Sequence, residues 1–207
     1  NSIRLLYHHS FGGGDVLTAG ADYLHDYLFN TNLDGNTRKQ DSFDAFAQYD
    51  WSIDNVWEIV GALRYDYFSN GHTSHLTPKL SARYQPVHNL NIRFGYGMGF
   101  RAPTLKEKYY NFDMAGIWIV EGNPNLKAEV SHNFNLSAEY TKNHYNFTVS
   151  SYYNRINNKI ATGAPYYANP SDVMPHLPYL NLSDYSVLGA EATAQARWSN
   201  GLTARLA

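Results

Sequence analysis

The chain has 207 residues, with 18 acidic against 16 basic side chains and a formal net charge of −2. This balance, without any run of Lys or Arg, excludes a nucleic-acid binder held by a basic surface, and the absence of Cys excludes disulfides, Cys–zinc sites and thiolate catalysis. No stretch approaches the roughly 18 consecutive apolar residues of a membrane-spanning helix, and the mean hydropathy is −0.48. A barrel wall stays compatible with these values, because alternating strands average out as polar.

Apolar and polar residues alternate along most of the chain with a period of two, which is typical of strands whose two faces meet different environments. In chain order, the alternating segments are residues 3–11, 43–53, 57–67, 76–85, 90–101, 130–140, 145–153, 188–198 and 202–207. In residues 90–100, every second residue is large and apolar, and those between are Asn, Arg or Gly. No convincing helical spacing of three and four is found. We therefore predict an all-β antiparallel meander of about ten strands.

The connections between these segments alternate between short and long. The short ones are residues 12–15, 54–56, 86–89, 142–144 and 199–201, and the long or irregular ones are residues 30–41, 69–74, 102–127 and 161–181. Antiparallel strands joined in this way place every short turn at one end of the sheet and every long loop at the other. Outer-membrane barrels have this asymmetry.

Aromatic residues gather toward both ends of the predicted strands. Trp51, Trp57, Tyr84 and Trp198 lie beside short connections, whereas Tyr27, Phe29, Tyr65, Tyr67, Phe100, Tyr152 and Tyr153 lie toward long ones. Two such belts are typical of the two membrane–water interfaces, although cross-strand aromatic pairs in a soluble sheet give a similar pattern. The opposite, polar face is expected to line a wet lumen with Arg64, Asp66, Lys79, Arg83, Arg93, Arg101, Glu139, Glu191 and Arg197.

The predicted strands are too few to close a barrel of the size that strands of this length usually form. Ten strands close only a small barrel, whereas long strands with long loops are typical of barrels of about 22 strands around a plugged lumen. The alternation is already under way at residues 3–11 and continues through residues 202–207. We therefore expect residues 1–207 to be one partial barrel domain, a piece of a large transmembrane β-barrel.

Two sequence boxes carry a family resemblance. The segments GYGMGFRAPTLKEKYY (residues 95–110) and EGNPNLKAEVSHNFNLSAEY (residues 121–140) resemble the TonB-dependent outer-membrane receptors. In that family, a GFRAPTLKEL-like box closes one strand and a GNPNLKPE-like box opens the next. Residues 59–86 and 187–198 resemble its wall strands more loosely, and Ala128 stands where the family usually has proline.

This resemblance implies a 22-stranded type of barrel in the bacterial outer membrane, with an N-terminal plug and a coupling segment that contacts TonB. Neither of these parts is recognisable in this chain. Such receptors actively import scarce ligands, mostly ferric siderophores, haem or cobalamin. The implied partners are outer-membrane lipid, TonB and a small-molecule chelate, with no nucleic acid. No resident cofactor is expected, since the iron or cobalt belongs to the transported ligand.

The segment between the two boxes is the first candidate for ligand contact. Arg101, in the first box, ends the predicted strand, and Tyr109, Tyr110, Met114 and Trp118 follow it along the chain. The segment can either grip a planar or hydrophobic chelate or pack on its own aromatics, and both interpretations are open. Haem receptors resembling this family usually carry a histidine here as an axial ligand, and its absence argues against haem. Tyr109, Tyr110 or Met114 could still ligate iron.

Histidines in other connections are the second set of candidates. His72 and His75 fall in one predicted loop and His176 in another, beside Met174. Two imidazoles facing each other could hold haem or a divalent metal, although loop histidines are more often solvated.

Two further predictions concern residues away from the boxes' connecting segment. His25 and His132 fall on outward positions and are expected at the membrane interface. Asp34, Asn36 and Asp41 suggest a calcium site only weakly, because their spacing does not match an EF-hand.

A row of glycines has a structural rather than a catalytic interpretation. Gly95, Gly97 and Gly99 share the polar face of one strand, where they would let another backbone, such as a plug, approach the wall closely. A dinucleotide fingerprint is not expected, because the sequence predicts no helix after this strand and the preceding strand is not fully apolar. There is no G-x-S-x-G or H-E-x-x-H motif, and an enzyme is not expected.

Active uptake of a metal chelate or cobalamin is thus the first functional hypothesis. A passive porin is one alternative, because a polar lumen also suffices for it. A soluble all-β carbohydrate-binding module is another, and it would require Phe94, Leu136 and Ala194 to meet across a sealed interior.

Overall fold

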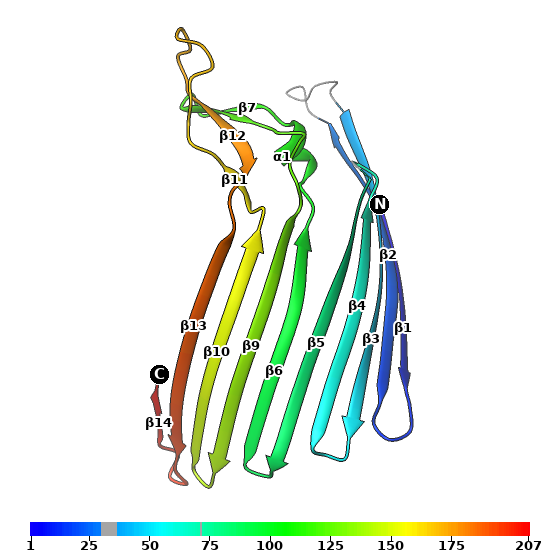
Figure 1. Cartoon of the computed structure of the whole chain (residues 1–207), viewed down its shortest axis with the longest axis vertical. Coiled ribbons are helices and arrows are strands. Elements are labelled where there is room, and N and C mark those ends of the chain that lie inside the picture. Colours follow the sequence, from blue (N-terminus) through cyan, green and yellow to red (C-terminus); the bar gives the residue numbers. More distant parts are fainter. Residues whose placement is uncertain (30–36, 71) are drawn as a thin grey trace.

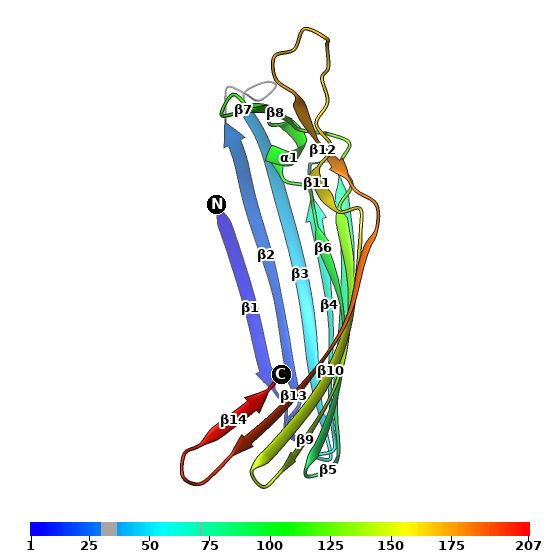
Figure 2. The same cartoon turned by 90° about the vertical axis from the view of Figure 1, so that its left-hand side faces the viewer.

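The computed structural model describes residues 1–29, 37–70 and 72–207, which form one large curved antiparallel sheet and a small sheet above one of its ends (Figures 1 and 2). The large sheet has ten strands in the order β1-β2-β3-β4-β5-β6-β9-β10-β13-β14, so neighbours in the sheet follow one another along the chain. Its strands are β1 (Ser2–Ser10), β2 (Val16–Phe29), β3 (Thr37–Ile53), β4 (Trp57–Phe68), β5 (Thr73–Val87), β6 (Leu90–Arg101), β9 (Glu129–Lys142), β10 (Tyr145–Asn157), β13 (Tyr185–Arg197) and β14 (Thr203–Leu206). The predicted meander of about ten strands is confirmed.

The short turns all lie at the lower end of the sheet in Figure 1, and the longer connections lie at the upper end, as the sequence predicts. At two of the lower turns the chain bends through Asp54, Asn55 and Asn143, which have φ values of 53°, 53° and 51°. Asn and Asp tolerate this left-handed region, and such turns match the twist of a hairpin. At the upper end, β4 ends at Phe68 and β5 begins at Thr73, so the connection predicted as long or irregular at residues 69–74 is shorter than expected.

Pairing register separates the sheet into an apolar face and a polar face. On the apolar face Phe94 is opposite Leu136, and Phe147 is opposite Ala194. Phe94 is 38% exposed and Leu136 is 52% exposed, so they do not meet across a sealed interior. The buried apolar side chains of the described residues are Leu105, Val120, Leu126 and Ile160, all in the upper connections. The soluble-module interpretation is therefore wrong, because the ten-stranded sheet has no dry core of its own.

The apolar face has an aromatic belt near each end. Near the lower turns, Trp57 stacks on Tyr84 with ring centroids 4.3 Å apart, and near the upper end Tyr96 lies 4.8 Å from Phe134. From Trp57 to Tyr67 the strand rises about 33 Å, or about 25 Å along the membrane normal at the usual tilt of barrel strands. That height matches the apolar band of an outer-membrane barrel.

Two of the predicted belt aromatics lie elsewhere. Tyr152 is on the polar face, where its ring covers Gly189, because consecutive strand residues point to opposite faces and Tyr153 takes the apolar side. Phe100 stacks on His75 at 4.2 Å. This ring contact lies beyond the end of the β5–β6 ladder, whose last pair is Lys79–Gly97. The ladder ends next to Pro78, because the proline nitrogen has no hydrogen to donate.

The two outward histidines lie on the apolar face, at its upper margin, as predicted. The Tyr96 hydroxyl and His132 Nδ1 are 3.0 Å apart, and His25 Nδ1 is 2.7 Å from Asp41 Oδ1. Within the described ranges, no helix has the length and apolar character needed to span a bilayer.

The small sheet joins the two longest upper connections. The β6–β9 loop (residues 102–128) holds α1 (Leu105–Tyr109), β7 (Phe112–Met114) and β8 (Trp118–Glu121), and the β10–β13 loop (residues 158–184) holds β11 (Ile160–Thr162) and β12 (His176–Asn181). Their strand order is β11-β12-β8-β7, and β12 pairs with β8 in parallel. We call these two connections the joined loops. They lie above the upper ends of β6, β9, β10 and β13 in Figure 1.

Candidate functional site

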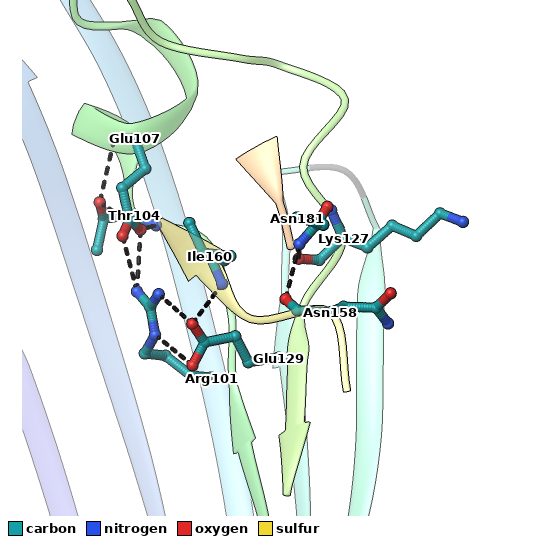
Figure 3. A network of polar contacts seen from close by, with 8 residues as sticks. All are labelled: Arg101, Thr104, Glu107, Lys127, Glu129, Asn158, Ile160 and Asn181. Atoms are coloured by element: carbon teal, nitrogen blue, oxygen red, sulfur yellow. Dashed lines mark hydrogen bonds and ion pairs between the residues drawn. The ribbon is translucent and has the colours of Figure 1, made fainter. Parts of the chain in front are cut away.

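Arg101, the last residue of β6, is held by two carboxylates at the base of the joined loops (Figure 3). Its Nε and one terminal nitrogen donate to the two oxygens of Glu129 at 3.1 and 2.8 Å. Its other terminal nitrogen donates to both oxygens of Glu107 at 2.9 and 3.0 Å. This fork geometry is specific to a planar guanidinium. The predicted ligand contact is therefore already engaged with the protein itself.

Helix α1 is fixed at both ends. At its N-terminus, Thr104 and Glu107 form a capping box, in which the Glu107 amide donates to the Thr104 hydroxyl at 3.2 Å and the Thr104 amide donates to the Glu107 carboxylate at 2.8 Å. At its C-terminus, the Tyr109 hydroxyl donates to Asn70 Oδ1 at 3.0 Å, and the Arg38 guanidinium lies 4.8 Å from the Tyr109 ring centroid. The helix thus reaches from the end of β6 to β3 and to the turn after β4.

The second loop is tied to the first at several backbone groups. Glu129 Oε1 accepts the Ile160 amide at 2.6 Å, which brings β11 to the start of β9. The Asn181 side chain accepts the Lys127 amide at 2.7 Å and donates to the carbonyls of Lys127 and Asn158 at 2.9 and 2.8 Å (Figure 3). A single amide side chain therefore satisfies main-chain groups on both loops.

Gly122, in the second sequence box, lies against the backbone of α1. A Cβ at this position would be 2.7 Å from the Tyr109 nitrogen and 2.8 Å from the Lys108 carbonyl carbon. Next to it, the Asn123 amide donates to the Glu107 carbonyl at 2.8 Å. Only glycine permits so close an approach of two main chains. The GNPN box therefore packs the loop onto the helix that follows the first box.

The inter-box residues are divided between packed and exposed positions. The Tyr110 ring lies 4.9 Å from that of Phe112. Met114 and Trp118 face each other as the closing pair of the β7–β8 hairpin, and Met114 is 53% exposed whereas Trp118 is half-buried. The segment therefore packs partly on its own aromatics and leaves Met114 exposed to solvent, and contact with a ligand stays a prediction.

His176 lies at the start of β12, between carboxylates from both loops. Its Nδ1 is 2.6 Å from Glu121 Oε1, and its Nε2 is 3.6 Å from Asp172 Oδ2. The Tyr166 hydroxyl donates to the other Glu121 oxygen at 2.7 Å, and this hydrogen bond raises the pKa of Tyr166. His176 thus serves as a tie between β8 and the β10–β13 loop, with 16% of its side chain exposed.

Replacing His176 with alanine should loosen residues 163–175 without unfolding the barrel, because it removes the imidazole that bridges Glu121 and Asp172 and leaves the Tyr166–Glu121 hydrogen bond as the remaining side-chain contact of Glu121 with this segment. We expect faster chymotrypsin cleavage after Tyr166 and Tyr167 in the folded receptor. His88→Ala, in a lower turn, is the control and should leave the cleavage rate unchanged. Equal cleavage of both variants would show that the tie does not hold the loop.

His72 and His75 are not a facing pair. His72 lies in the turn before β5, with its Nδ1 3.2 Å from the hydroxyl of Tyr67, a residue of the apolar face. His75 is inside β5, not in a loop, on the polar face, opposite Asp66 and stacked on Phe100. The two imidazoles therefore contact different residues, because His72 precedes the strand and meets Tyr67, whereas His75 lies within the strand and meets Phe100.

A row of charged residues crosses the polar face below the rim. Arg4, Asp22, Asp44, Asp66 and His75 are successive partners on β1 to β5. Arg4 pairs with Asp22 at 2.7 Å, and Arg64, beside the row, bridges Asp44 and Asp66 at 3.1 and 2.9 Å. Its members from Arg4 to Asp66, together with Arg64, line part of a groove of about 670 Å³. Among the described residues, no three His, Asp or Glu side chains are grouped closely enough to hold a metal ion.

The glycine row on β6 is mostly covered by its own wall. The space above Gly95 is taken by the Asn135 amide, and that above Gly99 by the Ser131 hydroxyl, so a Cβ on either would collide with β9 side chains. Above Gly97 there is open space. The predicted close approach of another backbone therefore has room at Gly97 only. Of the suggested calcium ligands, Asp34 and Asn36 lie outside the described residues, and Asp41 is bonded to Tyr23 and His25.

Sequence reasoning missed the partners of Arg101. The T-x-x-E pattern of Thr104 and Glu107 is a helix-start signal that could have located α1. Nothing local indicated that Glu129 would receive both Arg101 and the Ile160 amide, because Ile160 is 31 residues away in the chain.

These features define a class of protein. A long-stranded, strongly curved antiparallel meander with a lipid-type apolar face, a charged opposite face and structured loops at one end is part of the wall of a transmembrane β-barrel. The comparisons with known proteins agree. The family described as "TonB dependent receptor-like, beta-barrel" matches residues 2–207. The chain belongs to this family of TonB-dependent receptors.

Individual relatives cover much of this chain but only part of their own length. The vitamin B12 transporter BtuB of Photobacterium profundum is 29% identical over 190 residues, which are 90% of this chain and 29% of the relative. An iron-regulated outer membrane virulence protein of Vibrio cholerae is 26% identical over 160 residues, which are 72% of this chain and 24% of the relative. The chain therefore spans less than a third of the length of these relatives.

Solved structures show the same fold. The siderophore receptor PirA of Pseudomonas aeruginosa superposes with a TM-score of 0.86 at 20% identity, over 98% of this chain and 40% of the receptor. The hemophore receptor HasR of Serratia marcescens, solved with its hemophore and heme, gives a TM-score of 0.73 at 16% identity, over 94% of this chain and 38% of HasR.

Proposed function

We propose that this chain forms part of the wall and the ligand-capturing rim of an active transporter in the bacterial outer membrane. The family match over residues 2–207 carries this proposal. The imported nutrient is an iron chelate, either a siderophore or haem, or cobalamin, because the names of the relatives and neighbours include a vitamin B12 transporter, siderophore receptors and a hemophore receptor. The chain acts as a receptor and transporter wall and not as an enzyme.

Each face of the sheet has a part in this function. The apolar face contacts outer-membrane lipid, and the polar face lines the lumen through which the ligand passes. The joined loops, at the rim, meet the ligand first, with Met114 and Trp118 as contacts from the β7–β8 hairpin. Arg101, Tyr109 and His176 support this surface through their contacts within the protein. TonB would act through the plug and coupling segment of the family and not through this wall.

Uptake should depend on the proton-motive force. In cells that produce the full-length receptor, radiolabelled cyanocobalamin, a ferric catecholate siderophore and haem are offered separately. We expect saturable uptake of one of them, and a protonophore should abolish it, because the energy for release comes from the inner membrane. Cells lacking the receptor gene are the control.

A passive porin is the alternative, and the charged polar face favours it because such a face also suits a water-filled channel. Receptor-dependent uptake that persists unchanged with the protonophore would establish the porin and refute active transport. Absence of receptor-dependent uptake for all three compounds would contradict the proposed nutrient class.

A further inference from the structure

Arg101 joins three parts of the molecule: the wall, the first joined loop and the second. It ends β6, its partner Glu107 belongs to α1, and its partner Glu129 begins β9 and accepts the amide of Ile160 in β11. We propose that Arg101 is a positioning residue, which fixes the joined loops at a set place over the lumen. This rests on the proposed function in one respect, that these loops capture the ligand.

The first contact path leads across the rim. Glu107 is bound to Arg101 by both oxygens and also closes the capping box of α1. From the other end of α1, Tyr109 reaches Asn70 beyond β4. A shift of Arg101 would therefore also move helix α1, which is bonded at its other end to Asn70 in the turn after β4.

The second path leads into the small sheet. Glu129 receives the Arg101 fork on two oxygens and holds the Ile160 amide on one of them. Ile160 begins β11, which pairs with β12, and β12 pairs with β8 of the first loop. The first path thus leads to the turn after β4 and the second to the four-stranded sheet, and both start from one guanidinium.

Electrostatics makes the guanidinium necessary. The side chains of Glu107 and Glu129 are only 15% and 20% exposed, while that of Arg101 is 42% exposed. Without the guanidinium, two largely covered carboxylates lose the one cation that binds both of them, which costs free energy. Two further ties between the loops do not involve Arg101, since Asn181 bonds Lys127 and Asn123 bonds Tyr179. The loops should therefore stay joined to each other and lose their fixed place on the wall.

The same two strands provide a matched control. Arg93 donates to Glu139 at 2.8 Å, and this second Arg–Glu pair also links β6 to β9. It lies near the lower turns, and Glu139 otherwise bonds only Asn146 among its described side-chain contacts. Replacing Arg93 thus removes a cross-strand ion pair of the same kind without touching either joined loop.

The test uses the full-length receptor in cells, with Arg101→Ala, Arg101→Lys, Arg101→Ala/Glu129→Gln and Arg93→Ala. Heat-modifiable migration in gels first establishes that each barrel is folded. Trypsin cleavage at the loop lysines Lys106, Lys108, Lys127 and Lys159 then reports loop position without any ligand. Uptake of cyanocobalamin and of ferric enterobactin gives a half-saturation concentration and a maximal rate for whichever probe is transported.

For Arg101→Ala, we expect faster cleavage of the loop lysines and a roughly tenfold higher half-saturation concentration, with an unchanged maximal rate, because capture weakens while translocation does not. Arg101→Lys should recover only part of the loss, since an ammonium cannot engage both carboxylates as a fork. The double variant Arg101→Ala/Glu129→Gln should bind the probe better than Arg101→Ala, because it also removes the negative charge that Arg101 no longer balances. Arg93→Ala should match the wild type in every measurement.

Three results would overturn the proposal. The first is trypsin protection that is unchanged in Arg101→Ala, and the second is equal effects of Arg93→Ala and Arg101→Ala. The third is an altered maximal rate with an unchanged half-saturation concentration, since that places Arg101 in translocation. If the wild-type receptor transports neither probe, the proposed nutrient class is weakened, while the protease comparison still decides the role of Arg101.

Discussion

Val149→Arg should lower the free energy of unfolding of the barrel by about 2–4 kcal/mol, the usual cost of an arginine at the midplane on the lipid side. Val149 lies on the apolar face of β10, halfway between Tyr145 and Tyr153, and is 59% exposed in this sheet. Its neighbours across the ladders are Ala138 and Ala192, which offer the guanidinium no partner. Folding of the full-length receptor into lipid vesicles, followed by urea titration, measures this change.

The adjacent residue is the matched control. Thr148 points to the polar face, opposite Glu139 and Thr193. Thr148→Arg adds the same side chain one residue away, where water and a carboxylate receive it, and should change the unfolding free energy by less than about 1 kcal/mol. Equal destabilisation by the two variants would contradict the assignment of lipid and water to opposite faces.

Gly122→Ala should displace the joined loops while the barrel stays folded. Its Cβ would collide with main-chain atoms of Lys108 and Tyr109, and backbone cannot rotate away as a side chain can. Overpacking of this kind costs about 1–3 kcal/mol. The added methyl group would push the second box away from α1, which displaces the loops that we propose to capture the nutrient. We therefore expect at least tenfold weaker nutrient capture and faster trypsin cleavage after Lys108.

Gly12→Ala is the control for this substitution. Gly12 lies in a lower turn, where an added Cβ would meet no atom within 4 Å, and it does not need a positive φ. The substitution should leave capture, cleavage and stability as in the wild type. Wild-type capture by Gly122→Ala would show that the second box tolerates a side chain against α1 and that the loop geometry does not depend on this glycine.

The wall was predictable because its signal is local. In β6, Arg93 and Phe94 point to opposite faces simply because they are consecutive strand residues, and lipid and water select opposite side chains. Turn residues such as Asp54 and Asn55 similarly mark where the chain reverses. The same rule shows why Tyr152 and Tyr153 could not both belong to one belt: alternation assigns the second to lipid and the first to the lumen.

The candidate site was predictable only in its outline. The two boxes located the segment between β6 and β9, and the sequence named Met114 and Trp118, which the structure brings together. It did not indicate that Arg101 would be bound by Glu107 and Glu129 or that His176 would meet Glu121, 55 residues away. Pairing in parallel between β8 and β12 has no periodic signature, since it depends on which distant backbone groups lie within reach.

The sequence by itself determined most strands of the large sheet, their two faces, the end of the sheet that carries the long connections, and the family. Only the tertiary structure decided that these connections form one sheet, and that an expected ligand contact, Arg101, holds them to the wall. The physical reason is the range of the interactions: alternation and turns are set by neighbouring residues, whereas ion pairs and the β8–β12 ladder exist only once distant segments have been brought together.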